Sequence, residues 1–318
     1  MKDVALGSCF HDVAYVVTDV GRAAARLSAL VPGTAFSITW IALRSVDSNN
    51  PQARASEPIE LQCAAAPVGP HGEYEIRLLQ PLNRDPVFHG AIAAAGPGLH
   101  HAGFCVSDLD RAAQRMARHG VPIAHLRDED GRRHLYYRCD PIGGLIELSS
   151  GQDGAPPPVE AAAGSLAAHF TQIAYVVDDI DAARRWMEEA LGCEVMAARD
   201  VVQGPAWNLR FRGQPVGYDF SLKMVVGRLG PTGQGQLELL EPQRNNNVLA
   251  DFLRDHGPGL NHIAFAVPDY EQLTRPLRST GVPALKEIHV PGTVHSSYFD
   301  CSRDELGTIE VFETGPHA

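Results

Sequence analysis

A short strand-like segment occurs four times along the chain, at residues 10–17, 99–106, 170–177 and 260–267. Each copy carries one polar side chain at its third position. These four residues are Asp12, His101, Gln172 and His262. A repeated unit with one variable polar position indicates a fold built by stacking copies of that unit. The residues at the variable positions then decide what a site shared by the copies can bind.

The two halves of the chain match each other. Asp12 corresponds to Gln172 and His101 to His262 at a nearly constant spacing. A Gly- and Pro-rich segment with few large apolar residues separates the halves, as is typical of a linker. The sequence therefore predicts a first domain over residues 1–150, a linker over 151–165 and a second domain over 166–318. The linker indicates a spacer between two independent domains.

Each half contains a second, weaker duplication. Every unit begins with one of the four strands and closes with another strand that also carries a polar residue. The closing residues are Arg77, Glu147, Glu238 and Glu310. Further β-like runs lie between them, so the expected unit is β-α-β-β-β, repeated four times.

One helix is expected inside each unit. Residues 110–119 and 181–191 each begin with Asp and are followed by Gly, which are helix start and stop signals. The helix after Asp269 contains Pro276. Because proline removes a backbone donor and its ring clashes with the preceding turn, we expect a kink or a late start there.

The composition restricts the class of protein. A chain of 318 residues with 44% apolar and 20% charged residues fits two soluble globular domains. A net charge of −11 argues against binding to nucleic acid. The sequence has no apolar run of membrane-spanning length and no signal-like start, so a cytoplasmic protein that does not bind membranes is expected. The six scattered cysteines indicate reduced thiols.

The closing glutamates stand in an unusual setting for a carboxylate. Glu147, Glu238 and Glu310 each lie in a strand-like run between large apolar neighbours. Burying a carboxylate there costs free energy unless the group is paired or binds a metal. We therefore expect the polar positions of the first and last strands to converge on one concave face.

The repeated unit, with polar residues on its first and last strands, resembles the vicinal oxygen chelate superfamily over nearly the whole chain. This superfamily includes glyoxalase I, methylmalonyl-CoA epimerase, extradiol dioxygenases and bleomycin-resistance proteins. Residues 96–101 and 257–265, both beginning Gly-Pro-Gly-Leu, are similar to the glyoxalase and epimerase branch. The resemblance implies an α+β fold in which four βαβββ units form two tandem domains, each a curved mixed sheet enclosing a cleft.

The resemblance also implies a metal site, because first- and last-strand residues hold the metal in this family. Carried over, the second half supplies the ligand pattern of the glyoxalase I branch: Gln172, Glu238, His262 and Glu310. In the first half Arg77 departs from the pattern, because a guanidinium cannot ligate a cation. We expect Asp12 and Arg77 to form an ion pair there, in a degenerate or repurposed cleft, and one divalent metal ion per chain.

Two arrangements of the cleft remain open at this point. In this family the two units of a cleft come from one domain or are swapped between domains. Swapping would combine Gln172 and Glu238 with His101 and Glu147. Both halves offer a His and a Glu, so the ligand types do not decide, although the Pro-rich linker favours the unswapped site.

The donor set indicates the chemistry. Two carboxylates, an imidazole and an amide oxygen suit zinc, nickel, cobalt, iron or manganese. Such an ion polarises a carbonyl, and a carboxylate beside it can move the acidified proton. The implied reaction is proton abstraction alpha to a carbonyl through a metal-bound enediolate, as in a lyase, isomerase or epimerase. Glu310 is the expected base, and Glu238 the expected ligand and second base.

Two other functions fit the same fold. An extradiol-type ring-cleaving dioxygenase needs two His and one carboxylate on iron, and Gln172 stands where the first His should be. A metal-free small-molecule binding or resistance protein would use the clefts only to hold its ligand, and Arg77 shows that one cleft has lost a ligand position.

The expected partner is a small molecule with a carbonyl or vicinal oxygens, and the chain is expected to be a monomer or a homodimer. Four residues are candidates to line the pocket: Trp207, Arg210, Phe211 and Tyr298. A CoA thioester would need basic residues at the cleft mouth, for which the candidates are Arg210, Arg212, Lys223 and Arg228.

Overall fold

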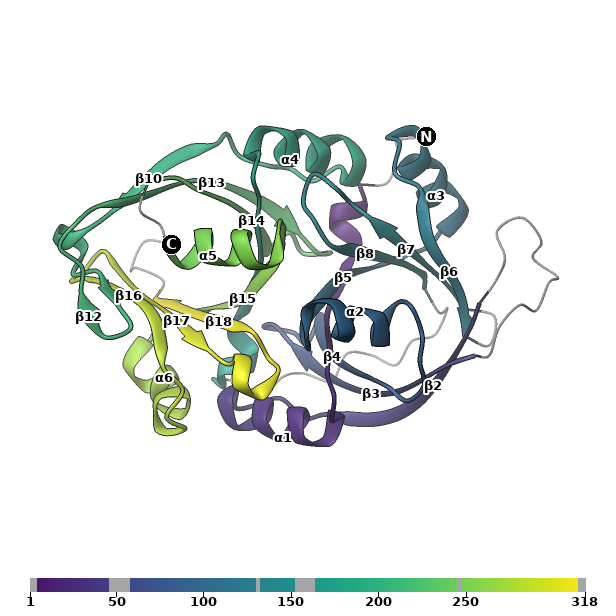
Figure 1. The fold of residues 1–318 in the computed structure, drawn as a ribbon, viewed down its shortest axis with the longest axis horizontal. Helices are drawn as coiled ribbons and strands as arrows, with labels where there is room; N and C mark the ends of the chain where they lie inside the picture. The colour runs from purple at the N-terminus through teal and green to yellow at the C-terminus, as the bar shows by residue number, and fades with distance from the viewer. Residues whose placement is uncertain (1–4, 46–57, 130–131, 152–163, 245–246, 314–318) are drawn as a thin grey trace.

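The computed structural model describes residues 5–45, 58–129, 132–151, 164–244 and 247–313. Figure 1 shows two lobes side by side, with the first half of the chain in one and the second half in the other. Most of the expected linker lies outside the described residues, so the domain boundaries stay a prediction.

The first domain contains two successive βαβββ units with a helix, α2, between them. Its elements are β1 (Phe10–Val16), α1 (Val20–Leu30), β2 (Ser37–Ser45), β3 (Ile59–Val68), β4 (Tyr74–Pro81), α2 (Phe88–Ala95), β5 (Gly98–Val106), α3 (Leu109–Arg118), β6 (Ile123–Glu129), β7 (Arg132–Arg138) and β8 (Leu145–Ser150).

The second domain repeats this plan, with α5 in the place of α2 and a short added hairpin, β11–β12. Its elements are β9 (Phe170–Val176), α4 (Ile180–Trp186), β10 (Arg199–Gln203), β11 (Arg210–Phe211), β12 (Gln214–Pro215), β13 (Phe220–Leu229), β14 (Gly235–Pro242), α5 (Asn247–His256), β15 (Gly259–Val267), α6 (Tyr270–Ser279), β16 (Ala284–Val290), β17 (Val294–Asp300) and β18 (Thr308–Glu313).

Strand pairing unites the two units of each half. The first and last strands of every unit are parallel neighbours, and the two first strands of a domain, β1 with β5 and β9 with β15, pair antiparallel. In the first domain β2 also pairs with β6, which closes an eight-stranded barrel. The second domain is a ten-stranded curved sheet with β10 and β12 at its edges. The two domains are therefore one closed and one open version of the expected fold.

Each unit helix begins directly after an aspartate that caps it. The carboxylate accepts a hydrogen bond from the backbone N–H three residues later, which satisfies a helix N–H that has no partner within the helix. The four caps are Asp19, Asp108, Asp179 and Asp269. The helix after Asp269 thus starts at once, at Tyr270, and the expectation of a late start was wrong. Pro276 is accommodated inside it.

The helix expected at 181–191 ends where the glycine predicted but changes its winding. The α-helical part stops at Trp186, and residues Met187–Leu191 form a π-helical turn. Gly192 follows with a φ of 67°, a left-handed conformation that glycine adopts at little cost.

The two domains share a hydrophobic core. One cluster of buried side chains includes residues from both halves. The Tyr74 ring packs at a tilt against Phe10 of its own domain and Phe170 of the other, with centroids 5.5 and 5.6 Å away. Ion pairs from α1 to the loop before β18 add polar contacts, with Arg22 on Glu305 at 2.7 Å and Arg26 on Asp304 at 2.8 Å. The expectation that the domains are independent therefore does not hold for their packing.

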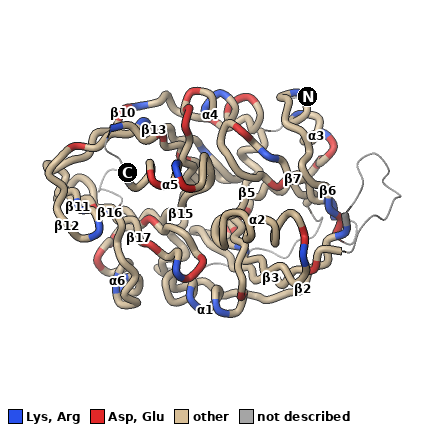
Figure 2. Tube along the Cα trace, viewed as in Figure 1, with Lys and Arg blue, Asp and Glu red and all other residues tan. Residues whose placement is uncertain are grey.

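Charged residues of both signs are interspersed over the two lobes in the view of Figure 2. Within the described part of the chain, no helix combines the length and the apolar character needed to cross a bilayer.

Candidate metal centre

Four neighbouring strands at the centre of the second domain bring the four expected ligands together. Gln172 lies on β9, Glu238 on β14, His262 on β15 and Glu310 on β18. On β9 the residue directly opposite both Glu238 and His262 is the small Ala174. The long polar side chains can therefore meet above the alanine.

The ligand atoms lie close enough to share one ion. The Nε2 atom of His262 is 3.2 Å from Oε2 of Glu310 and 3.8 Å from Oε2 of Glu238, and the three donors fall within 4.8 Å of one another. Among the described residues, this is the one group of three His, Cys, Asp or Glu side chains so placed. The amide of Gln172 donates from Nε2 to Oε2 of Glu238 at 2.9 Å, which adds the fourth member.

His262 is oriented as a ligand would be. Its Nδ1 lies 2.9 Å from Oδ1 of Asn261, and an N–H there donates to the amide oxygen. The other ring nitrogen, Nε2, is buried, has no hydrogen-bond partner and offers a lone pair to a metal once it carries no proton. A buried nitrogen without a partner, facing two carboxylates, fits a divalent ion that completes the group.

Two residues that the sequence analysis did not assign to the metal site support this group from β17. Ser296 donates to Oε1 of Glu310 at 2.6 Å, which leaves Oε2 on the side of His262. The ring of Tyr298, expected only to line the pocket, packs edge-on against the His262 ring with centroids 5.0 Å apart. Ser296 and Tyr298 are two residues apart on β17 and therefore share a face of the strand.

The two carboxylates differ in their tendency to ionise. Burial and the neighbouring Glu310 raise the pKa of Glu238 to about 8. Burial also opposes ionisation of Glu310, but the adjacent His262 and the positive charge of Lys286 outweigh it and lower the pKa of that carboxyl. In the metal-free protein the pair therefore favours one proton on Glu238 and an ionised Glu310.

A cavity of about 510 Å³ opens beside the group. Its floor includes Gln172, Glu238 and Glu310, and its polar side includes Gln203 and Lys286. The remaining lining is mainly apolar, as is usual for a small-molecule pocket. Its apolar members are Val201, Val202, Trp207, Leu222, Met224, Val226, Leu240, Ile288, Val294 and Phe312, and its other members are Arg199, Asp200, Gln236, Ser296 and Tyr298.

Some expected pocket residues are confirmed and others are not. Trp207 and Tyr298 line the cavity. Arg210 and Phe211, together with the basic candidates Arg212, Lys223 and Arg228, are outside its lining. The basic residues that do line it are Arg199 and Lys286, which the sequence analysis missed. The signal for Lys286 was its place in an alternating strand, on the same face as Ile288.

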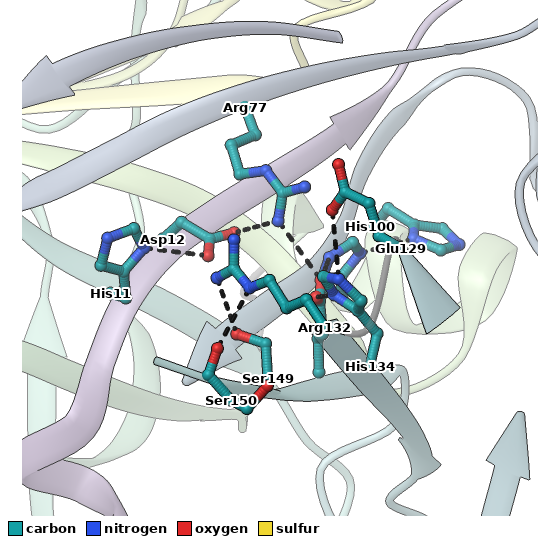
Figure 3. A network of polar contacts seen from close by, with 11 residues as sticks. His11, Asp12, Arg77, His100, Glu129, Arg132, His134, Ser149 and Ser150 are labelled. Carbon is teal, nitrogen blue, oxygen red and sulfur yellow. Dashed lines mark hydrogen bonds and ion pairs between the residues drawn. The ribbon is translucent and has the colours of Figure 1, made fainter. Parts of the chain in front are cut away.

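The corresponding positions of the first domain hold a network of buried charges. The Arg77 guanidinium lies 3.6 Å from Asp12 and 3.4 Å from Glu147, which confirms the expected ion pair (Figure 3). His101 and His134 donate to the two oxygens of Glu147 at 2.8 and 2.5 Å. Burial opposes ionisation, but Arg77 and the two histidines hold the pKa of Glu147 well below its usual range.

A close backbone approach makes room for this network. Asp12 pairs in register with Gly103, and a Cβ atom at Gly103 would meet the Asp12 carboxylate at 2.3 Å. The matching residue opposite Gln172 is Ala264. Glycine at position 103 therefore leaves room for the Asp12 carboxylate that pairs with Arg77.

The structure divides the swapped ligand set between the two domains. Gln172 and Glu238 bond to each other in the second domain, whereas His101 and Glu147 bond to each other in the first. The residues that lie together are those of the unswapped set.

One family model matches both domains. It is described as the glyoxalase/bleomycin resistance protein/dioxygenase superfamily, and it matches residues 11–137 and 171–299. A search of curated proteins found no match.

Several solved structures are similar over most of the chain. A triple mutant of 4-hydroxymandelate synthase from Streptomyces coelicolor is 15% identical, with a TM-score of 0.62 over 98% of this chain and 94% of that one. A Mn(II)-bound glyoxalase from Novosphingobium aromaticivorans is 14% identical, with a TM-score of 0.52 over 96% and 82%. BphC, a halotolerant catechol dioxygenase, is 12% identical, with a TM-score of 0.51 over 98% and 88%. At these identities the likeness shows the fold alone.

Proposed function

Since this chain belongs to the glyoxalase/bleomycin resistance protein/dioxygenase superfamily, we propose that it is a metal-dependent enzyme of the glyoxalase type. It would act as a lyase, isomerase or epimerase on a small carbonyl compound. The observation that carries the proposal is the buried group of Glu238, His262 and Glu310, of which the two glutamates line a mainly apolar cavity.

The residues present suit a divalent ion. Glu238, His262 and Glu310 supply two carboxylates and one imidazole, and Gln172 can supply its amide oxygen after a turn of the side-chain amide. This donor set fits zinc, nickel, cobalt, iron or manganese. When bound, such an ion polarises a carbonyl and makes the neighbouring C–H more acidic.

The protein's own groups would then move the proton. Glu310, held by Ser296 through one oxygen, presents its other oxygen at the cavity floor and would accept the proton from the substrate carbon. Glu238 lies on the other side of His262 and could return a proton from there.

The donor set speaks against the two alternatives. A ring-cleaving dioxygenase with two His and one carboxylate on iron would need a second imidazole, but the group in the cavity has one. A metal-free binding protein would leave two carboxylates and an unpartnered His262 Nε2 buried together, at a cost in stability.

Hydrogen exchange with solvent tests the proposal. Metal-loaded protein in D₂O should exchange the C–H alpha to the carbonyl of 2-oxo and 2-hydroxy carbonyl compounds, as followed by NMR. Glu310→Gln should abolish the exchange, with metal content measured in parallel. Oxygen uptake with a catechol, without any such exchange, would support the dioxygenase instead.

A further inference from the structure

Lys286 is a buried cation whose role the metal group does not explain. Its side chain is 5% exposed, on β16. The ammonium donates to Oε1 of Gln203 at 3.3 Å and lies 4.1 Å from the centroid of the Tyr298 ring. Among the described residues no carboxylate lies within ion-pair distance of Nζ. Glu238 and Glu310 attract the ammonium only from beyond ion-pair distance. A buried charge that is only partly compensated is costly, so the position favours an anion in direct contact.

The register of the sheet places this cation next to the metal group. Lys286 pairs with Tyr298, and Tyr298 pairs with Glu310, across three adjacent strands. All three residues line the cavity, so one aromatic ring separates the ammonium from the carboxylate. A ligand at the cavity floor therefore has the metal group on one side and the ammonium on the other.

Gln203 reaches Lys286 from the opposite edge of the sheet. It is the last residue of β10, whereas Lys286 lies on β16 across the cleft. The amide oxygen faces the ammonium, which leaves the amide N–H₂ as a second donor at the same place. One ammonium and one amide suit a carboxylate, whereas phosphate sites usually gather several cationic groups.

The charge balance gives the net charge of the ligand. Among the charged residues that line the cavity, a dication cancels Glu238 and Glu310, and Arg199 and Asp200 carry opposite charges that cancel each other. The ammonium of Lys286 is left as an excess of one positive charge. A ligand with one negative charge makes the buried site neutral, and a low-dielectric site favours that state. The apolar wall, with Leu222, Met224, Leu240 and Phe312, would receive an uncharged remainder.

We propose that Lys286, oriented by Gln203, binds a carboxylate of the substrate, so that this site takes monoanionic carbonyl acids with an apolar remainder. This inference rests on the metal-dependent function proposed above. Lys286 and Gln203 are specificity-determining residues in this account, and Glu310 remains the base.

Binding measurements on a matched ligand pair test this directly. Benzoylformate and benzoylformamide differ in charge but share the ring, the ketone and a second vicinal oxygen. Their affinities for the Mn²⁺-loaded full chain are measured by calorimetry in the wild type, in Lys286→Met and in Lys223→Met. Lys223 lies outside the cavity lining, on the same domain, and serves as the matched control.

The ratio of the benzoylformate affinity to the benzoylformamide affinity measures the preference for a carboxylate. The metal's own preference for an anion is the same in all three proteins, so a change in this ratio reports on the substituted side chain. A hydrogen bond to a charged group contributes about tenfold or more to an affinity. We expect Lys286→Met to lower the ratio by about tenfold or more, with Lys223→Met unchanged. Lys286→Arg should retain much of the preference. A Lys286→Met protein that keeps both its metal and the wild-type ratio would overturn the proposal.

Two further outcomes are separable. If Lys286→Met fails to fold or to load metal, Gln203→Met tests the same subsite while leaving the ammonium, and an unchanged ratio there overturns the proposal. If the wild type itself binds no metal, that result contradicts the metal-dependent function, and the carboxylate site that rests on this function is then contradicted as well.

Discussion

Arg77 and Glu238 occupy the same position in the two domains. Arg77 pairs in register with Ala14 on β1, and Glu238 pairs with Ala174 on β9, two residues after Asp12 and Gln172 respectively. Each faces a glutamate of the last strand, Glu147 or Glu310. A guanidinium therefore stands in one domain where the other offers a carboxylate, and this exchange accounts for an internal ion network in one cleft and a metal-binding donor set in the other.

Replacing Arg77 should destabilise the first domain strongly. In Arg77→Met the carboxylates of Asp12 and Glu147 lose the cation between them, and breaking a buried ion pair costs about 3–5 kcal/mol. Denaturant unfolding measures the loss. Arg228→Met is the control, because Arg228 is 70% exposed and 3.9 Å from Glu194, and should change stability by less than about 0.5 kcal/mol. A fully stable Arg77→Met would contradict this account of the network.

The same network should make stability depend on pH in the acid range. The folded-state pKa of Glu147 lies well below its usual 4.5, so its contribution is present above pH 4.5 and is lost as the pH falls below that value. The raised pKa of His134 adds nothing there, since this histidine is protonated in both states below pH 5. We expect the unfolding free energy to fall less steeply with acid in Glu147→Gln. If the unfolding free energy of the two proteins fell with acid at the same slope, the pKa of Glu147 would not be lowered in the folded state.

Metal binding should release a proton and strengthen with pH. Burial and Glu310 raise the pKa of Glu238 to about 8 in the metal-free protein, while Lys286, Arg199 and Gln172 act in the opposite direction. Because the metal needs the ionised group, this residue should raise the apparent affinity about tenfold per pH unit from pH 6 to 8. Glu238→Gln should show a shallower dependence in the same titration. If metal affinity rose equally steeply with pH in both proteins, the released proton would come from a group other than Glu238.

Ser296 should act on metal affinity through Glu310. Its hydroxyl bonds the oxygen of Glu310 that faces away from His262, and loss of such a supporting contact typically costs 10–100-fold in metal affinity or activity. We expect Ser296→Ala to weaken metal binding in a competition assay with a coloured chelator. Ser279→Ala, on the exposed end of α6, is the control and should bind as the wild type does.

The repeat made much of this site predictable. The four polar residues Gln172, Glu238, His262 and Glu310 lie on the same face of the sheet. In each unit the first and last strands are parallel neighbours, which brings these residues together regardless of the segments that connect the two strands. The helix caps at Asp19, Asp108, Asp179 and Asp269 were equally local signals. The departure at Arg77 was also visible, because no guanidinium can ligate a metal.

Other features depended on contacts that no local pattern encodes. His134 and Ser296 each bond the last-strand glutamate from the neighbouring strand, and only strand register reveals that they are equivalent. Lys286 meets Gln203 across the open edge of the sheet, between residues far apart in the chain. The closure of the first barrel depends on pairing of β2 with β6, two strands from different units.

Metal content tests the central claim most directly. Elemental analysis is made on protein purified without added metal or chelator, beside His262→Ala/Glu310→Ala and, as a control, His101→Ala/Glu147→Ala. The account predicts about one divalent ion per chain, lost in the first variant and retained wherever the second variant folds. An empty wild type that cannot be loaded, or an ion that survives the loss of His262 and Glu310, would contradict it.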